Sequence, residues 1–226
     1  MFSRLIQLIG EEKMNKIRSA SVLIFGLGGV GGNAAETIAR SGYGTIILVD
    51  NDTVELSNIN RQLVATTKTI NKPKVDALKE RILEINPTCQ VLTYNTFYNF
   101  ETKALIWDNK IDYVIDCIDT ITFKIDIVKE CQLRNIPLIS VMGTGNKYHP
   151  ERLEIIPLSK TEYDPIARVM RNKLKNDFNL NNIIVVASKE VPTKVDSTKL
   201  SPSSNAFVPN TAGIIAASYI FNKTIE

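Results

Sequence analysis

Residues 21–50 of this chain read SVLIFGLGGVGGNAAETIARSGYGTIILVD. The segment from Val22 to Phe25 is wholly apolar, as expected of a parallel strand that is covered on both faces. It runs directly into a turn with four glycines, and a helical pattern and a second apolar strand follow, ending at Asp50. One stretch of thirty residues therefore predicts a strand, a glycine turn, a helix and a second strand in that order.

The glycines of the turn have separate expected roles. Gly26 permits the tight turn, and Gly31 lets the following helix pack closely on the strand. The backbone amides of Gly28 and Gly29, at the start of the helix, would hold a phosphate. Asp50 stands near the position of a carboxylate that accepts hydrogen bonds from a ribose. These features predict a Rossmann-like nucleotide-binding unit, and a Walker-type loop is excluded because no Lys-Ser or Lys-Thr follows the glycines.

The rest of the chain continues as an α/β pattern. We expect a Rossmann-like, mostly parallel sheet flanked by helices, with a C-terminal extension of mixed strands and helices. The 226 residues fit one domain better than two, with a nucleotide-binding core at 1–142 and an extension at 143–226. An amphipathic helix is expected within 1–19. Further strands are expected at 89–93, 111–119, 137–142, 153–157 and 183–187, and helices after Pro73 to Ile85, at 121–134, at 164–178 and, capped by Asn210 or Thr211, at 211–221.

Composition narrows the class of protein. The longest apolar runs, such as 183–187, are far shorter than the roughly 20 residues of a membrane span. Cys89, Cys117 and Cys131 are widely spaced and odd in number, which favours reduced thiols in the cytoplasm over a disulfide framework. Because no Cys-x-x-Cys pair occurs, no zinc site is expected. We predict a cytoplasmic protein without a membrane span.

The net charge of +3 lies entirely in the last part of the chain. Residues 1–140 contain 16 Lys and Arg against 16 Asp and Glu, whereas residues 141–226 contain 11 against 8. An excess of this size usually means only a solvated surface, and on charge alone nucleic-acid binding is the less favoured interpretation.

The run Asn58-Ile59-Asn60-Arg61-Gln62 has no use in a generic dinucleotide fold. Together with the glycine turn, Asp50-Asn51-Asp52, Lys74 and Asp116-Cys117-Ile118-Asp119, it resembles the ubiquitin-activating-enzyme-like adenylyltransferase superfamily in order and spacing. This resemblance implies ATP and Mg²⁺ as cofactors and a homodimer in which Arg4 reaches into the partner's site.

The second half is similar to the tRNA threonylcarbamoyladenosine dehydratases within that superfamily. The similarity rests on Met142-Gly143-Thr144-Gly145, on the helix 164–175 and on the final helix. It implies ATP-dependent cyclisation of a modified adenosine in tRNA, by adenylation of its carboxylate. Two features depart from relatives: the zinc-binding cysteine pairs of many sulfur-carrier adenylyltransferases are absent, and Ser203 and Ser204 stand where some dehydratases have a cysteine.

The resemblance also assigns roles to single residues. Charged groups for catalysis are Arg61, Lys74, Asp119 and, from the other subunit, Arg4. Nucleotide binding is assigned to Gly26, Gly28, Gly29, Gly31, Asp50, Asp52, Asn58, Asn60, Arg61, Lys74, Asp119 and Thr120. Magnesium is assigned to Asp119, and tRNA contact to Arg168, Arg171 and Lys175, one stripe of the helix 164–178 that would otherwise be a solvated face.

Alternative interpretations remain at this stage. Asp50 could simply cap a strand end, Asp116 is better explained as structural, and Cys117 as a core residue. The whole chain could instead activate the C-terminal glycine of a ubiquitin-like sulfur carrier. An NAD-dependent oxidoreductase would use the glycines and Asp50 but not Arg61 or Lys74, and a non-catalytic nucleotide-binding module would not need Asp119.

Overall fold

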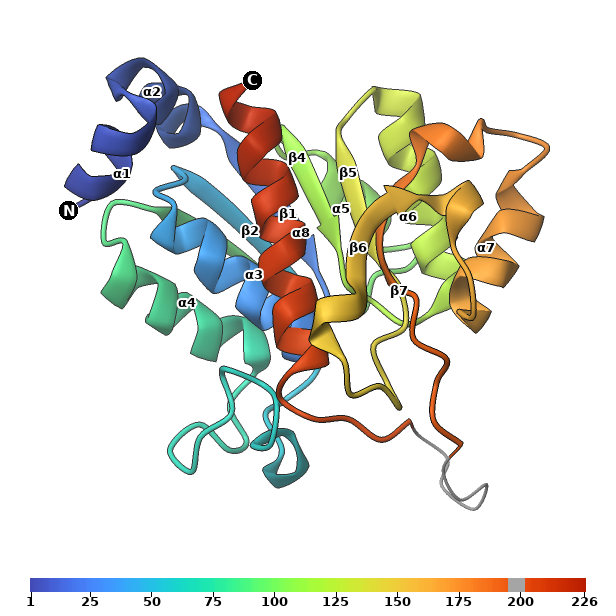
Figure 1. The fold of residues 1–226 in the computed structure, drawn as a ribbon. Coiled ribbons are helices and arrows are strands. Elements are labelled where there is room, and N and C mark those ends of the chain that lie inside the picture. The colour runs from blue at the N-terminus through green and yellow to red at the C-terminus, as the bar shows by residue number, and fades with distance from the viewer. Residues whose placement is uncertain (195–201) are drawn as a thin grey trace.

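A computed structural model describes residues 1–194 and 202–226 of the chain. Its centre is a seven-stranded sheet with the order β3-β2-β1-β4-β5-β7-β6, in which only β6 runs antiparallel to its neighbour (Figure 1). The strands are β1 (Ser21–Phe25), β2 (Thr45–Asp50), β3 (Gln90–Asn95), β4 (Tyr113–Asp116), β5 (Leu138–Val141), β6 (Leu153–Pro157) and β7 (Ile184–Ser188). The α/β fold expected from the sequence is confirmed.

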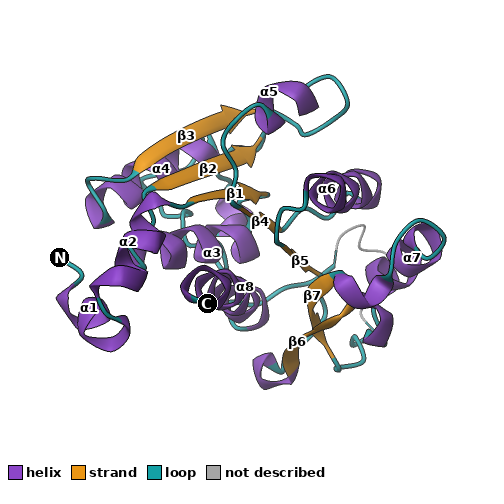
Figure 2. Ribbon diagram, turned by 90° about the horizontal axis from the view of Figure 1, so that it is seen from above, coloured by secondary structure: helices purple, strands orange, loops and turns teal. Residues whose placement is uncertain are grey.

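Helices cover both faces of the sheet (Figure 2). They are α1 (Ser3–Ile9), α2 (Glu11–Ser19), α3 (Gly29–Arg40), α4 (Lys74–Ile85), α5 (Lys103–Trp107), α6 (Ile121–Arg134), α7 (Pro165–Leu174) and α8 (Val208–Ile225). One apolar core joins α2, α3, α4 and α8 to the sheet, and a second joins α5, α6 and α7 to the opposite face. The C-terminal helix α8 packs mainly on α3, the helix that follows the glycine turn.

The strand order reverses between β1 and β4, which are adjacent although β2 and β3 follow β1 in the chain. Open α/β sheets bind ligands beyond the carboxyl ends of the strands at such a switch point. Gly26 follows β1 there with a φ of +78°, a conformation that favours glycine, and a side chain at this position would meet the backbone of Cys117 at 2.9 Å. A Cβ at Gly31 would lie 1.8 Å from the carbonyl oxygen of Gly26, so the close helix packing expected of Gly31 is present.

Several expected boundaries were wrong, each for a local reason. The N-terminal helix is interrupted at Gly10, which has a φ of +84°. Strand β4 ends at Asp116 rather than 119, because the carboxylate of Asp116 accepts the amide of Ile118 (3.2 Å) and turns the chain out of the sheet. Helix α7 ends at Leu174 rather than 178, just before the poor helix formers Asn176 and Asp177.

Helix α8 also begins earlier than expected. It starts at Val208, and Pro209 occupies its first turn, so Asn210 and Thr211 lie inside the helix and do not cap it. The side chain of Asn205 accepts the amides of Phe207 (2.9 Å) and Val208 (3.1 Å) instead. Among the described residues, no helix is long and apolar enough to cross a membrane.

Candidate active site

A hollow of about 430 Å³ opens at the switch point, within the size range of small-molecule sites. Its walls come from the glycine turn, the ends of β2 and β4, the loop after β3, and two segments of the C-terminal part of the chain. Of the residues predicted to bind the nucleotide or to act in catalysis, it brings together Gly26, Gly28, Gly29, Asp50, Asp52, Arg61, Lys74, Asp119 and Thr120.

Asp50 ties the second strand to the glycine turn. One carboxylate oxygen accepts the amide of Leu27 (2.5 Å) and the other accepts the amide of Asp52 (2.7 Å). Burial raises the pKa of Asp50, while the bond from Leu27 and the charge of Lys74 oppose that rise. Asp50 still lines the hollow, and each carboxylate oxygen has a second lone pair for a ribose hydroxyl. Asp50 therefore both caps the strand end and remains available to a ligand.

Lys74 is the best-fixed cation of the hollow. Its side chain is only 6% exposed, and its Nζ lies 2.7 Å from Asp52 Oδ2. The backbone holds the same pair together, since the amide of Lys74 donates to the carbonyl of Asp52 (2.9 Å). Arg61 is more exposed, and its Nη1 donates to Ser57 O (3.1 Å) and Asn60 Oδ1 (2.9 Å). Two cations thus line the hollow from the two ends of one loop.

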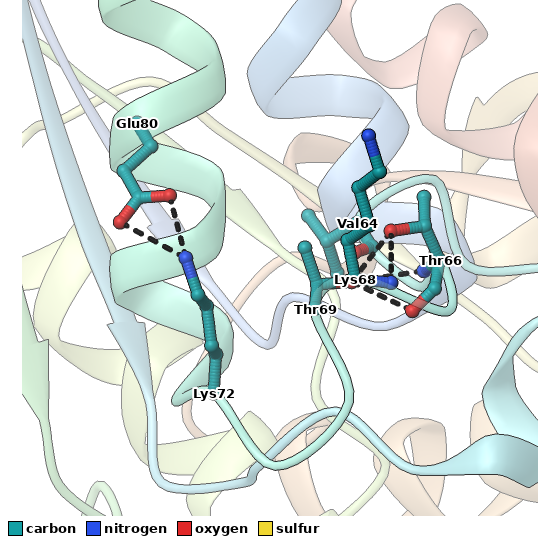
Figure 3. A network of polar contacts seen from close by, with 6 residues as sticks. All are labelled: Val64, Thr66, Lys68, Thr69, Lys72 and Glu80. Atoms are coloured by element: carbon teal, nitrogen blue, oxygen red, sulfur yellow. Dashed lines mark hydrogen bonds and ion pairs between the residues drawn. The ribbon is translucent and has the colours of Figure 1, made fainter.

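That loop, between Arg61 and Lys74, is bonded within itself (Figure 3). The hydroxyl of Thr69 donates to Val64 O (2.6 Å) and accepts the amide of Thr66 (2.9 Å). Lys72 does not line the hollow, and its Nζ pairs with Glu80 on α4 at 3.0 Å. Of the two neighbouring lysines, only Lys74 is therefore presented to a ligand.

Two carboxylates at the end of β4 have opposite environments. Asp116 is fully buried, ion-paired with Lys124 (2.9 Å), and accepts a bond from the hydroxyl of Ser140 (2.6 Å). Lys124 Nζ also donates to the carbonyl of Ile118 (2.9 Å), which fixes the turn that carries Asp119. Asp119 itself is exposed at the wall of the hollow and forms no hydrogen bond or ion pair with any residue that the structure describes.

Cys117 lines the hollow between these two carboxylates. Burial, and then the charge of Asp116, raise the pKa of its thiol far above the ordinary range. A thiolate is the reactive form of cysteine, so this environment suits a packing residue and not a nucleophile.

Four predicted residues lie outside the hollow. Gly31 lets α3 pack closely against the glycine turn. Asn58 is buried, and its side-chain oxygen accepts the amide of Glu55 (3.1 Å). Asn60 donates to the carbonyl of Ser204 (3.1 Å) and so ties the C-terminal part of the chain to the loop before Arg61. Arg4 lies on α1 beyond the amino ends of the strands, at the opposite end of the sheet from the hollow (Figure 1).

The hollow also has walls made by residues that were not assigned to the site from the sequence. These are Gln62, Thr96, Phe97, Tyr98, Thr144, Ser204 and Pro209. Gln62 stood in the quoted Asn-rich run, and its buried Oε1 has no hydrogen-bond partner within the described part of the chain. Residues 96–98 follow β3 without a recognisable motif, so only the sheet order reveals them. From the sequence, residues 188–209 are expected to form one long polar loop. Ser188 in fact ends β7 and Pro209 lies in α8, and residues 195–201 lie outside the described residues.

The predicted tRNA stripe is uneven. Arg168 on α7 and Lys175, the residue that follows the helix, are exposed. Arg171 is half-buried, and its Nη1 donates to the carbonyl of Thr161 (2.8 Å). The N-terminal cap of α7 is Asp164, which accepts the amide of Ala167 (2.9 Å). Asp164 also accepts the amide of Gly143 (2.9 Å). Thr144, which follows Gly143, lines the hollow.

A buried lysine supports the same junction. Lys147 Nζ donates to the carbonyl of Gly143 (2.7 Å) and lies 3.7 Å from Asp164 Oδ2. Burial lowers the pKa of Lys147, while Asp164 and Glu190 oppose that change. The start of α7 and the Gly143 turn are therefore held as one unit beside the hollow.

A family model described as the ThiF family matches residues 2–219. The chain belongs to the ThiF family. Among relatives of this ThiF-family chain, the tRNA threonylcarbamoyladenosine dehydratase of Bacillus subtilis is 44% identical to it, over 97% of the chain and 92% of the relative. The crystal structure of the Escherichia coli tRNA N6-threonylcarbamoyladenosine dehydratase TcdA in complex with ATP has a TM-score of 0.92 and 31% identity, over 99% of this chain and 93% of that one. A complex of the same protein with AMP is similar to the same degree, with a TM-score of 0.92 and 32% identity.

The similarity to the dehydratases predicted from the sequence is thereby confirmed. It extends over both parts of the chain and includes the C-terminal elements β6, α7, β7 and α8. As a member of the ThiF family, the chain shares its fold with adenylating enzymes that use ATP.

Proposed function

We propose that this protein uses ATP to dehydrate and cyclise threonylcarbamoyladenosine in tRNA. The carboxylate oxygen of the modified adenosine attacks the α-phosphate of ATP, pyrophosphate leaves, and an internal nucleophile of the substrate then closes the ring and displaces AMP. The observation that carries the proposal is the meeting of Lys74, Arg61 and Asp119 in one hollow beside the glycine turn.

This reaction needs neutralisation of phosphate charge more than a strong base. In the proposal, the amides of Gly28 and Gly29 hold phosphate at the start of α3, and Asp50 accepts the ribose hydroxyls. Lys74 and Arg61 contact the α-phosphate, and Asp52 holds Lys74 in position. Asp119, the exposed carboxylate that follows β4, is the remaining charged group of the proposed site.

Magnesium fits the chemistry of that carboxylate. Mg²⁺ keeps several waters and binds through one or two carboxylates together with substrate phosphates. Asp119 offers an exposed carboxylate without a protein partner among the described residues, so we assign the metal to it. When bound, the ion would neutralise charge on the phosphate oxygens. Asp119→Asn should raise the Mg²⁺ concentration needed for half-maximal turnover, with little change in ATP affinity measured without metal.

The C-terminal part, 143–226, is the proposed tRNA region, and 1–142 the ATP-binding core of the same domain. Support comes from the local excess of positive charge and from the exposed Arg168 and Lys175. Reduced cysteines suit a cytoplasmic location for such an enzyme.

A homodimer is part of the proposal. Arg4 does not line the hollow of its own chain, and its helix α1 lies at the other end of the sheet (Figure 1). A crossing Arg4 from a second subunit would supply a further cation. Mixing inactive Arg4→Ala and inactive Asp119→Ala subunits should restore part of the activity, because one of the two sites then holds both residues. No recovery after proven subunit exchange would exclude the crossing arginine.

The test of the reaction is mass spectrometry of tRNA nucleosides. After incubation of the protein with ATP, Mg²⁺ and tRNA that carries threonylcarbamoyladenosine, the nucleoside should lose the mass of one water, with AMP formed in equal amount. Activation of a sulfur-carrier C-terminal glycine with no effect on tRNA would favour the adenylyltransferase alternative. Tight NADH binding without ATP binding would favour the oxidoreductase.

A further inference from the structure

A second hollow, of about 270 Å³, lies at the start of α7. It is lined by Tyr163, Asp164, Pro165, Arg168 and Arg171. None of these residues lines the first hollow, at the switch point, which we call the nucleotide hollow. None has a role in the proposed adenylation chemistry.

The two hollows are neighbours through a single hydrogen bond. Asp164 lines the second hollow, and its Oδ2 accepts the amide of Gly143 at 2.9 Å. Thr144, the next residue, lines the nucleotide hollow. A polymer whose reacting group entered the first hollow would therefore have an adjoining unit at the second.

The side chains of the second hollow suit a nucleotide. Tyr163 is 58% exposed although it is a large aromatic residue. The side chain of Arg168 is exposed and makes no ion pair or hydrogen bond with the described residues. Proteins recognise unpaired RNA by stacking its bases on aromatic rings and by placing cations on its phosphates.

The backbone on both sides of the aromatic residue is anchored by hydrogen bonds. Arg171 donates to both the carbonyl and the hydroxyl of Thr161, which is buried two residues before Tyr163. Asp164, directly after Tyr163, is fixed by the cap of α7 and by Gly143. Anchors on both sides hold Tyr163 at a φ of +54°, an unfavourable value for its residue type. Arg171 is thus a positioning residue in this hollow.

We propose that this hollow binds one unpaired nucleotide of the tRNA next to the modified adenosine, with its base on Tyr163 and its phosphate at Arg168. The proposal rests on the proposed tRNA function. It assigns to the stripe of α7 a specific contact with a neighbouring nucleotide, in place of a general attraction to the RNA backbone.

The test measures binding of a fluorescent RNA stem-loop that carries the modified adenosine in its loop. Tyr163→Leu should raise the Kd about tenfold, whereas Tyr163→Phe, which keeps the ring, should leave it near that of the unaltered protein. Arg168→Gln should reduce the slope of log Kd against log salt by about 0.7, the value for one single-strand phosphate. Lys173→Gln, which removes a charge from a different side of the same helix, is the matched control and should do neither.

An abasic nucleotide on one side of the modified adenosine should weaken binding to the unaltered protein and abolish the further effect of Tyr163→Leu. An effect of Tyr163→Leu that persists with abasic RNAs on both sides, or no effect of it at all, would overturn the proposal. Because binding is measured without turnover, failure to convert the nucleoside would reject the proposed reaction and leave this result to be judged separately.

Discussion

The ends of β2 and β4 both reach the nucleotide hollow, and both carry two aspartates. At the end of β2, Asp50 and Asp52 line the hollow, and their partners are backbone amides and Lys74. At the end of β4, Asp116 is fully buried against Lys124, and Asp119 is left exposed. At the end of β2, both carboxylates stabilise the fold and also face the hollow. At the end of β4, Asp116 only stabilises the fold and Asp119 only faces the hollow.

This difference shows that distance along the chain does not decide the role of an acid in such a site. Asp116 is fully buried in a network with Lys124 and Ser140, where a ligand cannot reach it. Three residues later, the turn fixed by Lys124 exposes a carboxylate with all its capacity free within the described structure. The buried pair is therefore the support for the exposed acid.

The largest expected effect comes from breaking the buried pair. Lys124→Met should lower the free energy of unfolding by about 3–5 kcal/mol, because it leaves the carboxylate of Asp116 buried without its cation. Urea denaturation measures this change. Lys129→Met, which removes an exposed lysine paired with Asp177, is the control and should cost less than about 1 kcal/mol. Equal losses in the two variants would contradict the supporting role of the buried pair.

The next effect concerns the β2 end and should fall on turnover. Lys74→Met removes a fixed cation of the hollow and should lower kcat/KM by about 10²-fold or more, measured as AMP formation with tRNA. Lys72→Met removes a lysine two residues away that pairs with Glu80 instead, and should leave the rate within about twofold. A similar loss in both would mean that the loop as a whole, and not the position of one charge, matters.

The smallest effect is a pH dependence at Asp50. Burial raises its pKa in the folded chain above the ordinary 3.8, so its contribution to stability is fully present below that value and is lost as pH rises through the folded-state pKa. Replacement with Asn removes this loss. The stability of Asp50→Asn relative to the unaltered protein should therefore improve from about pH 3 to pH 7 in urea titrations. A difference that does not change with pH would show that the hydrogen bonds and the charge of Lys74 cancel the effect of burial on the pKa of Asp50.

Much of the fold was predictable because it depends on local patterns. The glycine turn, the apolar strands and the helix starts follow from residues close together in sequence, and all of the expected strands were found. The short helix α5 and the early start of α8 were missed because a distant packing surface and the side chain of Asn205 define them. Local sequence patterns do not reveal contacts of this kind.

Residues that belong to a sequence motif could be expected at the hollow, whereas residues from segments without a motif could not. The glycine turn and Asp50 were expected there from local sequence patterns, and Lys74 and Asp119 from the resemblance to the adenylyltransferase superfamily; all of them line the hollow. Thr96, Thr144 and Ser204 enter from segments that only the strand order brings together. Asn58 does not line the hollow and instead joins Glu55 in a capping box, a role that has the same appearance in a sequence as ligand binding.

The packing of α8 on α3 has a consequence for the order of events during synthesis. Residues 208–225 leave the ribosome long after the glycine turn, yet α8 covers the helix that follows this turn, and Pro209 forms part of the wall of the hollow. Domains generally fold as units once their residues have been synthesised. A nascent chain that ends before α8 therefore leaves an apolar face of α3 in water and has an incomplete wall. The hollow at the switch point is therefore complete only when the C-terminal helix has also been made.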